Sequence, residues 1–232
     1  MKSMKISIIT VVKDGVKEIA ETIGSISYQK KKYALDLEWI VIDGVSSDGT
    51  LELLNNNKDI IDIYISEKDA GIYDAMNKGL SLATGNGVLF LNAGDLLVGD
   101  VLEGVTRAPI YLPVFYTDIF GRFKKVRIGS KREGIPNCHQ GIIFPRTELR
   151  YSLDYKICSD YDFFLRHCFV DAIDLHKTSG YVIFSPGISS ISYKERDREI
   201  FNIRRIYFGF LSAILYEWRN FLKRIVRSFI FK

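Results

Sequence analysis

The residues best suited to chemistry in this sequence are acids and amides that directly follow apolar runs. The clearest case is VLFLNAGD at 88–95, where four consecutive apolar residues lead into Asn92, two small residues and Asp95. Asp95 is therefore a candidate ligand for Mg²⁺ or Mn²⁺, because these cations prefer carboxylate and shared phosphate oxygens. The alternative is a plain turn, since Asn, Gly and Asp are common turn residues.

Acidic loops also follow the earlier apolar runs. These loops carry Lys13 with Asp14, then Asp43 with SSDGT, then Glu67 with Asp69. If the runs are strands of a parallel sheet, all four loops lie along the edge where open α/β sheets bind ligands. One acidic turn is uninformative, but four at one edge favour a ligand cleft. For Asp43 and Asp48 the alternative is helix capping, because SSDGT can supply a cap.

Two glycine-rich phosphate-binding motifs are absent from the sequence. TVVKDGV follows the first apolar run, where a dinucleotide-binding GxGxxG would stand, and GxxxxGK[ST] occurs nowhere. A phosphate group would therefore have to be held by a bound metal and scattered donors.

Apolar patterning predicts the elements that position these loops. Runs rich in apolar and β-branched residues indicate strands at 5–12, 37–43, 62–66 and 87–95, and the runs at 5–12 and 37–43 are typical of buried strands. Helices are expected at 17–29, from 48 onward and at 71–84, the last ending at Gly85 as a left-handed terminator. Strands alternating with helices predict an α/β fold with a mostly parallel central sheet flanked by helices. Further along we expect a hairpin-like excursion over 100–135, a helix at 159–169 and a strand at 180–185.

Composition limits the class of protein. With 232 residues, 47% apolar and 26% charged, the chain can bury a sizeable core. The three cysteines have an odd count and no CxxC spacing, so we expect a reducing cytosolic setting without a disulfide framework. No apolar run reaches the roughly 18 residues of a membrane span. The N-terminal run is interpreted as a strand rather than a signal peptide, because it is β-branched and meets Lys13 and Asp14 at once.

Residues 201–232 form a basic tail. They contain seven basic residues and the single acid Glu217, whereas the rest of the chain carries 25 basic and 27 acidic groups. At helical spacing the tail separates apolar from basic residues: Tyr207, Leu211, Ile214, Trp218, Leu222, Ile225 and Phe229 against Arg205, Arg219, Lys223, Arg224 and Arg227. This pattern favours a basic amphipathic helix at a membrane surface. The alternatives are packing on the rest of the chain and a dimer seam, while the slightly acidic remainder disfavours nucleic acid.

Several segments together resemble the family 2 glycosyltransferases, most closely bacterial enzymes that build surface polysaccharides. In order they are ISIITVVKDG, WIVIDGVSSDGTLELL, ISEKDAGIYDAMNKGLSLATGNGVLFLNAGD, PNCHQGIIFPR and DYKICSDYDFFLRH, which span residues 5 to about 170. The resemblance implies a GT-A fold, a nucleotide-sugar donor, a divalent metal and inversion at the anomeric carbon. A UDP-sugar is the first candidate donor, and the transferred group would be a hexosyl or N-acetylhexosaminyl unit.

The resemblance also assigns donor-side roles. NAGD stands at the position of an acidic metal motif, so Asp95 would bind Mn²⁺ or Mg²⁺ and Asn92 would face the ribose. The other expected contacts with the nucleotide-sugar are Thr10, Val11, Asp14, Asp43 and Asp69. Three positions depart from the family pattern: Gly44 replaces a second acid, Asn92 replaces the first acid of the metal motif, and Lys13 replaces a frequent aromatic residue.

On the acceptor side the resemblance assigns Asp160 as the catalytic carboxylate. It would take the proton from the acceptor hydroxyl, and Asp162 and Asp154 are nearby competitors for that role. Asp162 also has Arg166 four positions later, and a salt pair on one helix face is the simpler interpretation of that spacing. His139 and Gln140 match a pair near the acceptor cleft, although a lone histidine is more often a structural hydrogen-bonding residue.

These observations divide the chain into a nucleotide-sugar-binding half at 1–100, an acceptor-binding half of the same domain at 101–200, and the tail. The leading hypothesis is a metal-dependent inverting glycosyltransferase, peripheral to the cytoplasmic face of the cell membrane, that extends a lipid-linked glycan. Nucleotidyl transfer would require a basic glycine-rich loop that TVVKDGV lacks. The other alternative is a catalytically silent module that binds nucleotide-sugar or glycan and recruits a partner, and the presence of both Asp95 and Asp160 argues against silence.

Overall fold

A central sheet of six strands carries the fold. The computed structural model describes residues 4–32, 36–118, 121–127, 129–130, 132, 135, 138–167, 175–185 and 193–230, excluding the side chains of 224–230. The parallel strands are β1 (Ile6–Val12), β2 (Leu37–Asp43), β3 (Ile63–Ser66) and β4 (Gly87–Phe90). β9 (Ile142–Pro145) pairs antiparallel to β4, and β6 (Ile110–Tyr111) pairs antiparallel to β9, which gives the order β3-β2-β1-β4-β9-β6. The expected mostly parallel sheet is thus confirmed.

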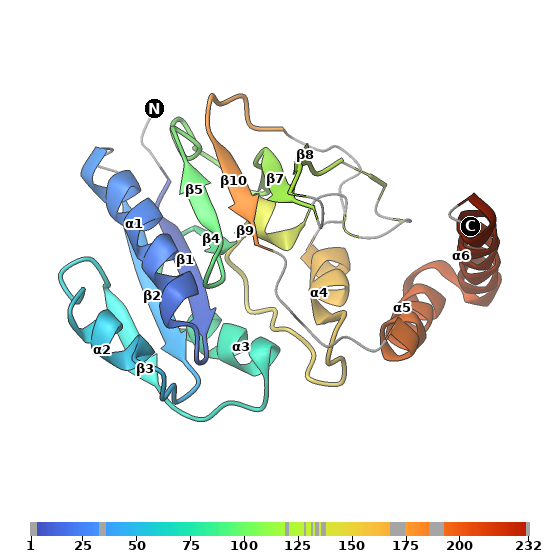
Figure 1. Ribbon diagram of the computed structural model, residues 1–232, viewed down its shortest axis with the longest axis horizontal. Helices are drawn as coiled ribbons and strands as arrows, with labels where there is room; N and C mark the ends of the chain where they lie inside the picture. The colour runs from blue at the N-terminus through green and yellow to red at the C-terminus, as the bar shows by residue number, and fades with distance from the viewer. Residues whose placement is uncertain are drawn as a thin grey trace.

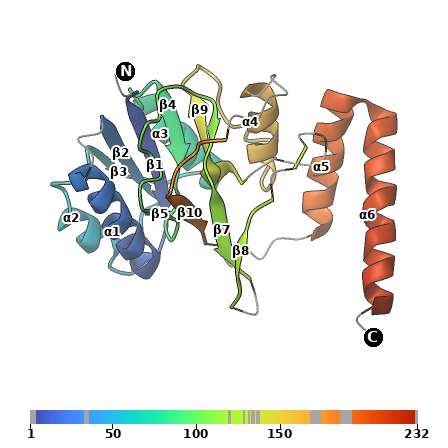
Figure 2. The same ribbon diagram turned by 90° about the horizontal axis from the view of Figure 1, so that it is seen from above.

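Helices cover both faces of this sheet (Figures 1 and 2). α1 (Val16–Lys32) and α2 (Thr50–Asn55) pack on one face, whereas α3 (Ile72–Leu82) and α4 (Ser159–His167) pack on the other. Alternate residues of β1 divide between the two cores, with Ile8 facing α1 and Ile9 facing α3. Burial on both faces explains the continuous apolar runs that predicted these strands.

The structure also contains a second sheet, of four strands, which the sequence did not predict as a unit. It contains β5 (Leu96–Val98), β10 (Tyr181–Phe184), β7 (Val114–Thr117) and β8 (Phe123–Lys125) in the order β5-β10-β7-β8. β7 and β8 are antiparallel, which confirms a hairpin within 100–135. The segments that pair in this sheet come from residues 96 to 184, so local patterning could not group them.

The expected role of Gly85 as a left-handed helix terminator is wrong. α3 ends at Leu82, and Ala83 already has extended backbone angles of φ −63° and ψ 131°. Gly85 does not have a positive φ, but a Cβ added there would lie 2.6 Å from the backbone nitrogen of Ser7. Glycine is therefore required for close approach to β1 rather than for a left-handed turn.

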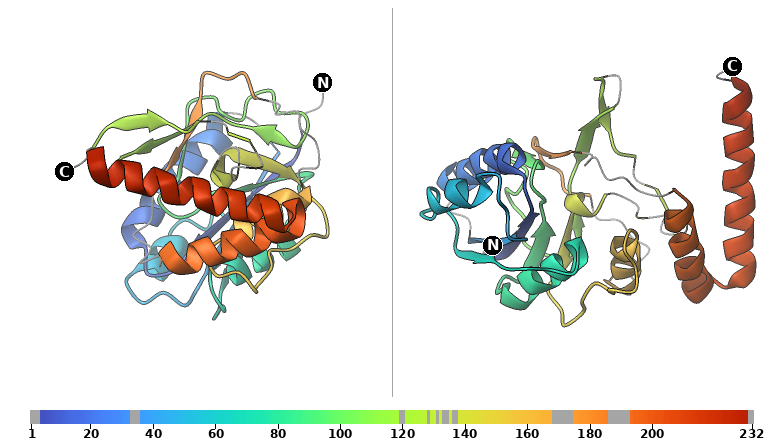
Figure 3. Two further views of the ribbon diagram at one scale, coloured as in Figure 1. Left: turned by 90° about the vertical axis from the view of Figure 1, so that its right-hand side faces the viewer. Right: turned by 60° about the horizontal axis from the view of Figure 1, so that its bottom comes forward.

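The C-terminal region is a pair of helices rather than one tail helix. α5 (Tyr193–Phe208) and α6 (Phe210–Ile230) run side by side in opposite directions and are joined at Gly209, whose φ is +84° (Figures 2 and 3). Residues 201–208 are thus the last turns of α5, where Ile203 is buried in the α3–α4 core. The described helices include none long and apolar enough to cross a membrane.

The predicted apolar stripe of the tail faces outward on α6. Leu211, Trp218 and Leu222 are 71%, 62% and 53% exposed, whereas Ala213 on the opposite side is fully buried. Packing of this stripe on the rest of the chain is therefore wrong for these residues. Ile225 and Phe229 belong to the predicted stripe, but their side chains lie outside the described residues.

Candidate active site

A pocket of about 400 Å³ opens where β1 ends and α3 begins. Its walls are formed by Val11, Val12, Lys13, Asp69, Gly71, Ile72 and Ala75. Two predicted donor-binding residues, Val11 and Asp69, therefore come together at the carboxyl edge of the sheet. The pocket combines apolar walls with one carboxylate and one ammonium group, a suitable lining for an aromatic base with polar edges.

Gly44 lies next to two residues that line this pocket, Lys13 and Asp69. A Cβ at Gly44 would lie 2.8 Å from Asp69 Oδ2 and 3.3 Å from Lys13 Cβ, so a side chain there would displace both groups. Asp69 is fixed in turn by the Gly71 backbone N–H, which donates to Oδ1 at 3.0 Å. A side chain at position 44 would therefore move the Asp69 carboxylate.

Asp43 is a buried residue whose carboxylate connects the loop after β2 with the end of β3. Its carboxylate accepts hydrogen bonds from the Ser46 hydroxyl, from the Ser46 N–H at 3.1 Å and from the Ser66 hydroxyl at 2.6 Å. The residue is fully buried, and these partners occupy both carboxylate oxygens. The structure does not bring the Asp43 carboxylate to the pocket wall.

Thr10 and Asp14 also lie off the pocket wall. The Thr10 hydroxyl points into the α1 core and accepts a hydrogen bond of 2.9 Å from Trp39 Nε1. Asp14 Oδ1 accepts the Ser47 N–H at 2.7 Å and thereby joins the loops after β1 and β2. Thr10 and Asp14 thus bond to other parts of the chain instead of lining the pocket.

Asp48, in the SSDGT loop, has the alternative role expected for that loop: its carboxylate accepts N–H groups at the starts of two helices. Asp48 Oδ2 accepts the Val16 N–H at 2.9 Å at the start of α1, and Oδ1 accepts the Thr50 N–H at 3.1 Å at the start of α2. The hydrogen bond from the Thr50 hydroxyl, together with these backbone bonds, holds the pKa of Asp48 below its ordinary value. The loop is therefore rigidly attached at the edge of the sheet.

The turn after β4 holds Asp95 in a buried position. Asp95 is 1% exposed, and its two oxygens accept the backbone N–H groups of Asn92 and Ser185, each at 2.9 Å. Burial raises the pKa of Asp95 from 3.8 to about 7. Gly94, with φ +92°, allows the tight turn, and its N–H donates to Thr22 Oγ1 on α1.

The turn after β4 offers the side-chain oxygens of Asn92 and Asp95 as possible ligands for a divalent cation. The described residues include no group of three or more His, Cys, Asp or Glu side chains that could hold a metal. However, Asn92 Oδ1 is buried without a hydrogen-bond partner, beside the buried Asp95 carboxylate in the same turn. Mg²⁺ is commonly held by one or two carboxylates together with substrate phosphates. Asp95 and Asn92 therefore fit the protein's share of such a site.

Asp160 lies at the start of α4, where three elements meet. Its Oδ2 is 3.4 Å from His139 Nδ1, and its Oδ1 is 3.5 Å from the Tyr73 hydroxyl. His139 also lies close enough to Asp95 to lower its pKa slightly against the effect of burial. The adjacent Gln140 is 4% exposed. His139 thus contacts the predicted base, Asp160, and partly offsets the effect of burial on the pKa of the predicted metal ligand, Asp95.

The N-terminal turn of α3 links this group to the pocket. Ile72 lines the pocket, and the next residue, Tyr73, donates from its hydroxyl to the Ile157 carbonyl at 2.6 Å. Burial raises the pKa of Tyr73 well above its ordinary value, so the hydroxyl remains a donor. One turn of helix therefore connects the pocket wall with the loop that precedes Asp160.

The competitors for the base are distinguished by their partners. Asp162 accepts two bonds from Arg166, at 2.9 Å and 2.7 Å, and a third from the Tyr207 hydroxyl at 3.0 Å. This confirms the salt pair expected from the spacing of Asp162 and Arg166. Asp154 is exposed and bonded to Ser152 within its own loop. Asp160 is the acid of the three that contacts His139.

Glu199 on α5 is a functional residue that the sequence did not reveal. Its carboxylate accepts three consecutive backbone N–H groups, from Lys156 at 2.8 Å, Ile157 at 3.0 Å and Cys158 at 2.9 Å. This arrangement fixes the loop directly before Asp160. Nothing in the local pattern indicates the contact, because more than forty residues separate Glu199 from its partners.

Comparison of the sequence with known proteins gives consistent matches. The model of "Glycosyl transferase family 2" matches residues 7–165. A PGL/p-HBAD biosynthesis glycosyltransferase of Mycobacterium bovis (strain BCG / Pasteur 1173P2) is 33% identical over 156 residues, which are 58% of this chain and 59% of that protein. An uncharacterized glycosyltransferase of Mycobacterium tuberculosis (strain CDC 1551 / Oshkosh) is 30% identical over 71% of this chain and 69% of its own length. The chain thus spans about three fifths of the first of these relatives.

Solved structures share the fold. The crystal structure of S. aureus TarS 1-349 in complex with UDP-GlcNAc has a TM-score of 0.65 and 15% identity, covering 88% of this chain and 65% of that one. The mannosyltransferase PcManGT from Pyrobaculum calidifontis, in complex with GDP-Man and Mn²⁺, has a TM-score of 0.59 and 16% identity, covering 87% and 63%. Both likenesses support the expected GT-A fold.

Proposed function

The chain belongs to glycosyl transferase family 2, and from this premise we propose that it transfers a sugar from a nucleoside diphosphate to a hydroxyl group with inversion. The observation that carries the proposal is the placement of Asp160. It contacts His139, which neighbours the buried Asp95, and Tyr73, which adjoins the pocket at the end of β1. Asp160 thus lies within 3.5 Å of side chains from two other segments, one of which adjoins the pocket.

In this proposal Asp160 is the general base. Its carboxylate, with 25% of the side chain exposed, takes the proton of the attacking hydroxyl. His139 and Tyr73 act as positioning residues, because each lies within 3.5 Å of one carboxylate oxygen. Single displacement by the deprotonated hydroxyl inverts the anomeric centre, since no covalent sugar–enzyme intermediate forms.

The pocket formed by Val11, Lys13 and Asp69 would bind the nucleoside, and Asn92 and Asp95 would face the diphosphate. Asp95 and Asn92 are the residues that would hold a divalent cation, which when bound neutralises charge on the diphosphate leaving group. The complexes of TarS with UDP-GlcNAc and of PcManGT with GDP-Man and Mn²⁺ support a nucleotide-sugar and Mn²⁺. A UDP-sugar carrying a hexosyl or N-acetylhexosaminyl group is the first candidate.

The acceptor is proposed to be a lipid-linked glycan in surface-polysaccharide assembly, with His139 and Gln140 on its side of the cleft. A relative named for PGL/p-HBAD biosynthesis supports a glycoconjugate product. The outward apolar residues of α6 and its basic residues support association with a membrane surface, at its cytoplasmic face. Residues 1–200 would form the catalytic domain to which α6 is attached.

Calorimetry and turnover test this function. UDP, GDP and dTDP are titrated in the calorimeter with and without Mn²⁺. Turnover is followed as hydrolysis of the matching nucleotide-sugars, in which water is the acceptor, for the wild type, Asp160→Asn and Asp154→Asn. Asp154→Asn removes the same charge from the exposed loop of the same region. We expect binding of one nucleotide, with turnover lost at least 100-fold in Asp160→Asn and retained in Asp154→Asn. Equal turnover in both variants would remove Asp160 as the base, and binding without any turnover would favour a silent recruiting module.

A further inference from the structure

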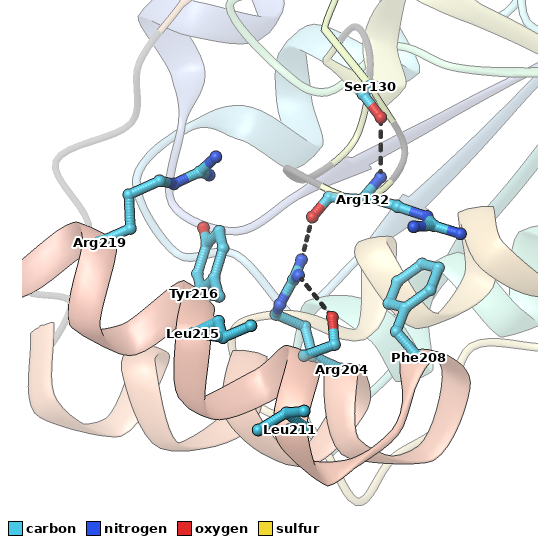
Figure 4. A pocket seen from close by; sticks show the side chains of 9 residues that line it. Ser130, Arg132, Arg204, Phe208, Leu211, Leu215, Tyr216 and Arg219 are labelled. Atoms are coloured by element: carbon cyan, nitrogen blue, oxygen red, sulfur yellow. Dashed lines mark hydrogen bonds between the residues drawn. The ribbon is translucent and has the colours of Figure 1, made fainter.

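A second pocket, of about 660 Å³, lies between the helix pair α5–α6 and the residues Ser130 and Arg132 (Figure 4). It is lined by Ser130, Arg132, Arg204, Phe208, Leu211, Ser212, Leu215, Tyr216 and Arg219. Glycosyl transfer as proposed above uses none of these residues. Seven of the nine described lining residues belong to α5 and α6, which follow the segment matched by the family model, whereas Ser130 and Arg132 lie within that segment.

The polar lining of this pocket is cationic. Three of the nine described lining residues are arginines and none is acidic. The guanidinium carbons of Arg204 and Arg219 lie 4.0 Å and 5.4 Å from the centre of the Tyr216 ring, so two positive charges gather around one aromatic side chain. Such a lining favours an anion.

Arg204 is a buried charge in the pocket wall. It is only 4% exposed, and it donates to the Arg132 carbonyl (Figure 4) and to the Ser212 hydroxyl, the latter at 3.4 Å. Its Nε is buried and has no hydrogen-bond partner among the described residues. A buried guanidinium with an incomplete set of hydrogen bonds is costly, and the charge of an anion in the pocket would lower that cost.

The other wall of the pocket is apolar and continues onto the outer surface. Leu211 and Leu215 line the pocket, yet they are also 71% and 62% exposed on the outward face of α6. Trp218, Phe221 and Leu222 extend this face, with 62%, 56% and 53% of each residue exposed. The pocket therefore places a cationic cavity beside an exposed apolar strip, and a matching ligand has an anionic head with an apolar chain.

We propose that this pocket binds the phosphate group of an anionic phospholipid while the outward face of α6 enters the acyl region of the bilayer. The arginines hold the headgroup, and Leu211 and Leu215 contact the first part of the acyl chains. This goes beyond general attraction to a membrane, because it assigns a defined headgroup site. It does not depend on catalysis, so failure of the transferase proposal would leave it open to its own test.

The sequence supplies a built-in reporter for the test. The chain has two tryptophans, of which Trp39 is fully buried and Trp218 lies 62% exposed on the outward face. A shift of tryptophan emission on adding vesicles therefore reports on Trp218. The full chain is mixed with vesicles of phosphatidylcholine alone and with vesicles that also contain phosphatidylglycerol. Binding is measured by emission and by co-sedimentation in low and in high salt.

Arg219→Gln tests the pocket, and Arg205→Gln is its matched control, since Arg205 is an exposed arginine of α5 that does not line it. Loss of one general surface charge weakens binding by at most about fivefold and less in high salt. We expect Arg219→Gln to weaken binding to phosphatidylglycerol vesicles at least about tenfold, also in high salt, because hydrogen bonds to a charged group are lost. Far-UV circular dichroism checks that both variants are folded.

The possible outcomes separate the sources of the anion. Equal weakening by both substitutions would overturn the headgroup site and leave only general attraction. Absence of vesicle binding, with a dimer in sedimentation velocity, would overturn the proposal in favour of a second copy covering α6. Inorganic phosphate that stabilises the wild type against thermal unfolding, but not Arg219→Gln, without vesicle binding would identify a free-phosphate site and equally overturn it. Blue-shifted Trp218 emission that requires phosphatidylglycerol and Arg219 supports it.

Discussion

Replacing Asp95 with asparagine tests the most unusual electrostatic feature of the cleft. Asp95 is 1% exposed, and burial raises its pKa from 3.8 to about 7. The folded state therefore keeps a proton that the unfolded state has released between about pH 4 and pH 7. Stability must fall as pH rises through this window, because the folded state binds more protons than the unfolded state.

The size of the effect follows from the same values. Between pH 5 and pH 8 the wild type should lose about 3 kcal/mol relative to Asp95→Asn, at about 1.36 kcal/mol for each pH unit up to about pH 7. The amide cannot ionise, and its NH2 group cannot accept one of the two N–H groups, of Asn92 and Ser185, that donate to separate oxygens of Asp95. Loss of that bond destabilises Asp95→Asn by the same amount at every pH, so the stability of the wild type relative to Asp95→Asn should fall between pH 5 and pH 8.

Urea unfolding at pH 5, 6, 7 and 8, in the presence of a chelator, measures this difference for the two proteins. Asp154→Asn serves as a control, since it removes a carboxylate from an exposed loop. A difference between wild type and Asp95→Asn that stays constant across this pH range would refute the reasoning. In a second arm, Mn²⁺ with UDP at pH 8 should stabilise the wild type more than Asp95→Asn, because a bound cation compensates the buried charge.

Two further substitutions test the frame around the cleft. Glu199→Gln should lower the free energy of unfolding by about 1–3 kcal/mol, because one carbonyl oxygen replaces a carboxylate that serves three N–H groups; a change below about 0.5 kcal/mol in urea would contradict this. Gly44→Ala should weaken nucleotide binding in calorimetry about tenfold, because its Cβ would displace Asp69. Gly24→Ala, whose Cβ would meet nothing within 4 Å, is the matched control, and equal affinity in both variants would contradict the steric argument.

Much of the donor half follows from local sequence pattern. β1, β2 and β4 are continuous apolar runs because both faces of the sheet are covered, so the sequence alone indicates their positions and the parallel arrangement. Short motifs likewise indicate the family and single out Asp95 and Asp160. The Asp162–Arg166 pair could be predicted for a similar reason, because the two residues lie one helical turn apart.

The roles of individual polar side chains depend on contacts between distant segments. Thr10 lies within β1, Asp43 ends β2 and Asp69 follows β3, yet Asp69 alone among them lines the pocket, because the other two point into packed interiors. Sequence spacing cannot separate these cases. Whether a side chain is exposed is decided by which helix or loop covers it.

The C-terminal helices show the same division between sequence and structure. The sequence by itself determined an amphipathic, basic pattern, since the apolar residues recur at helical spacing. The tertiary structure decided that the chain turns at Gly209, that Ala213 packs inward and that the apolar strip of α6 faces away from the body. It also brought Arg204 and Arg219 together around Tyr216. Periodicity fixes which residues share a helix face, but the direction in which that face points is set by packing against α5.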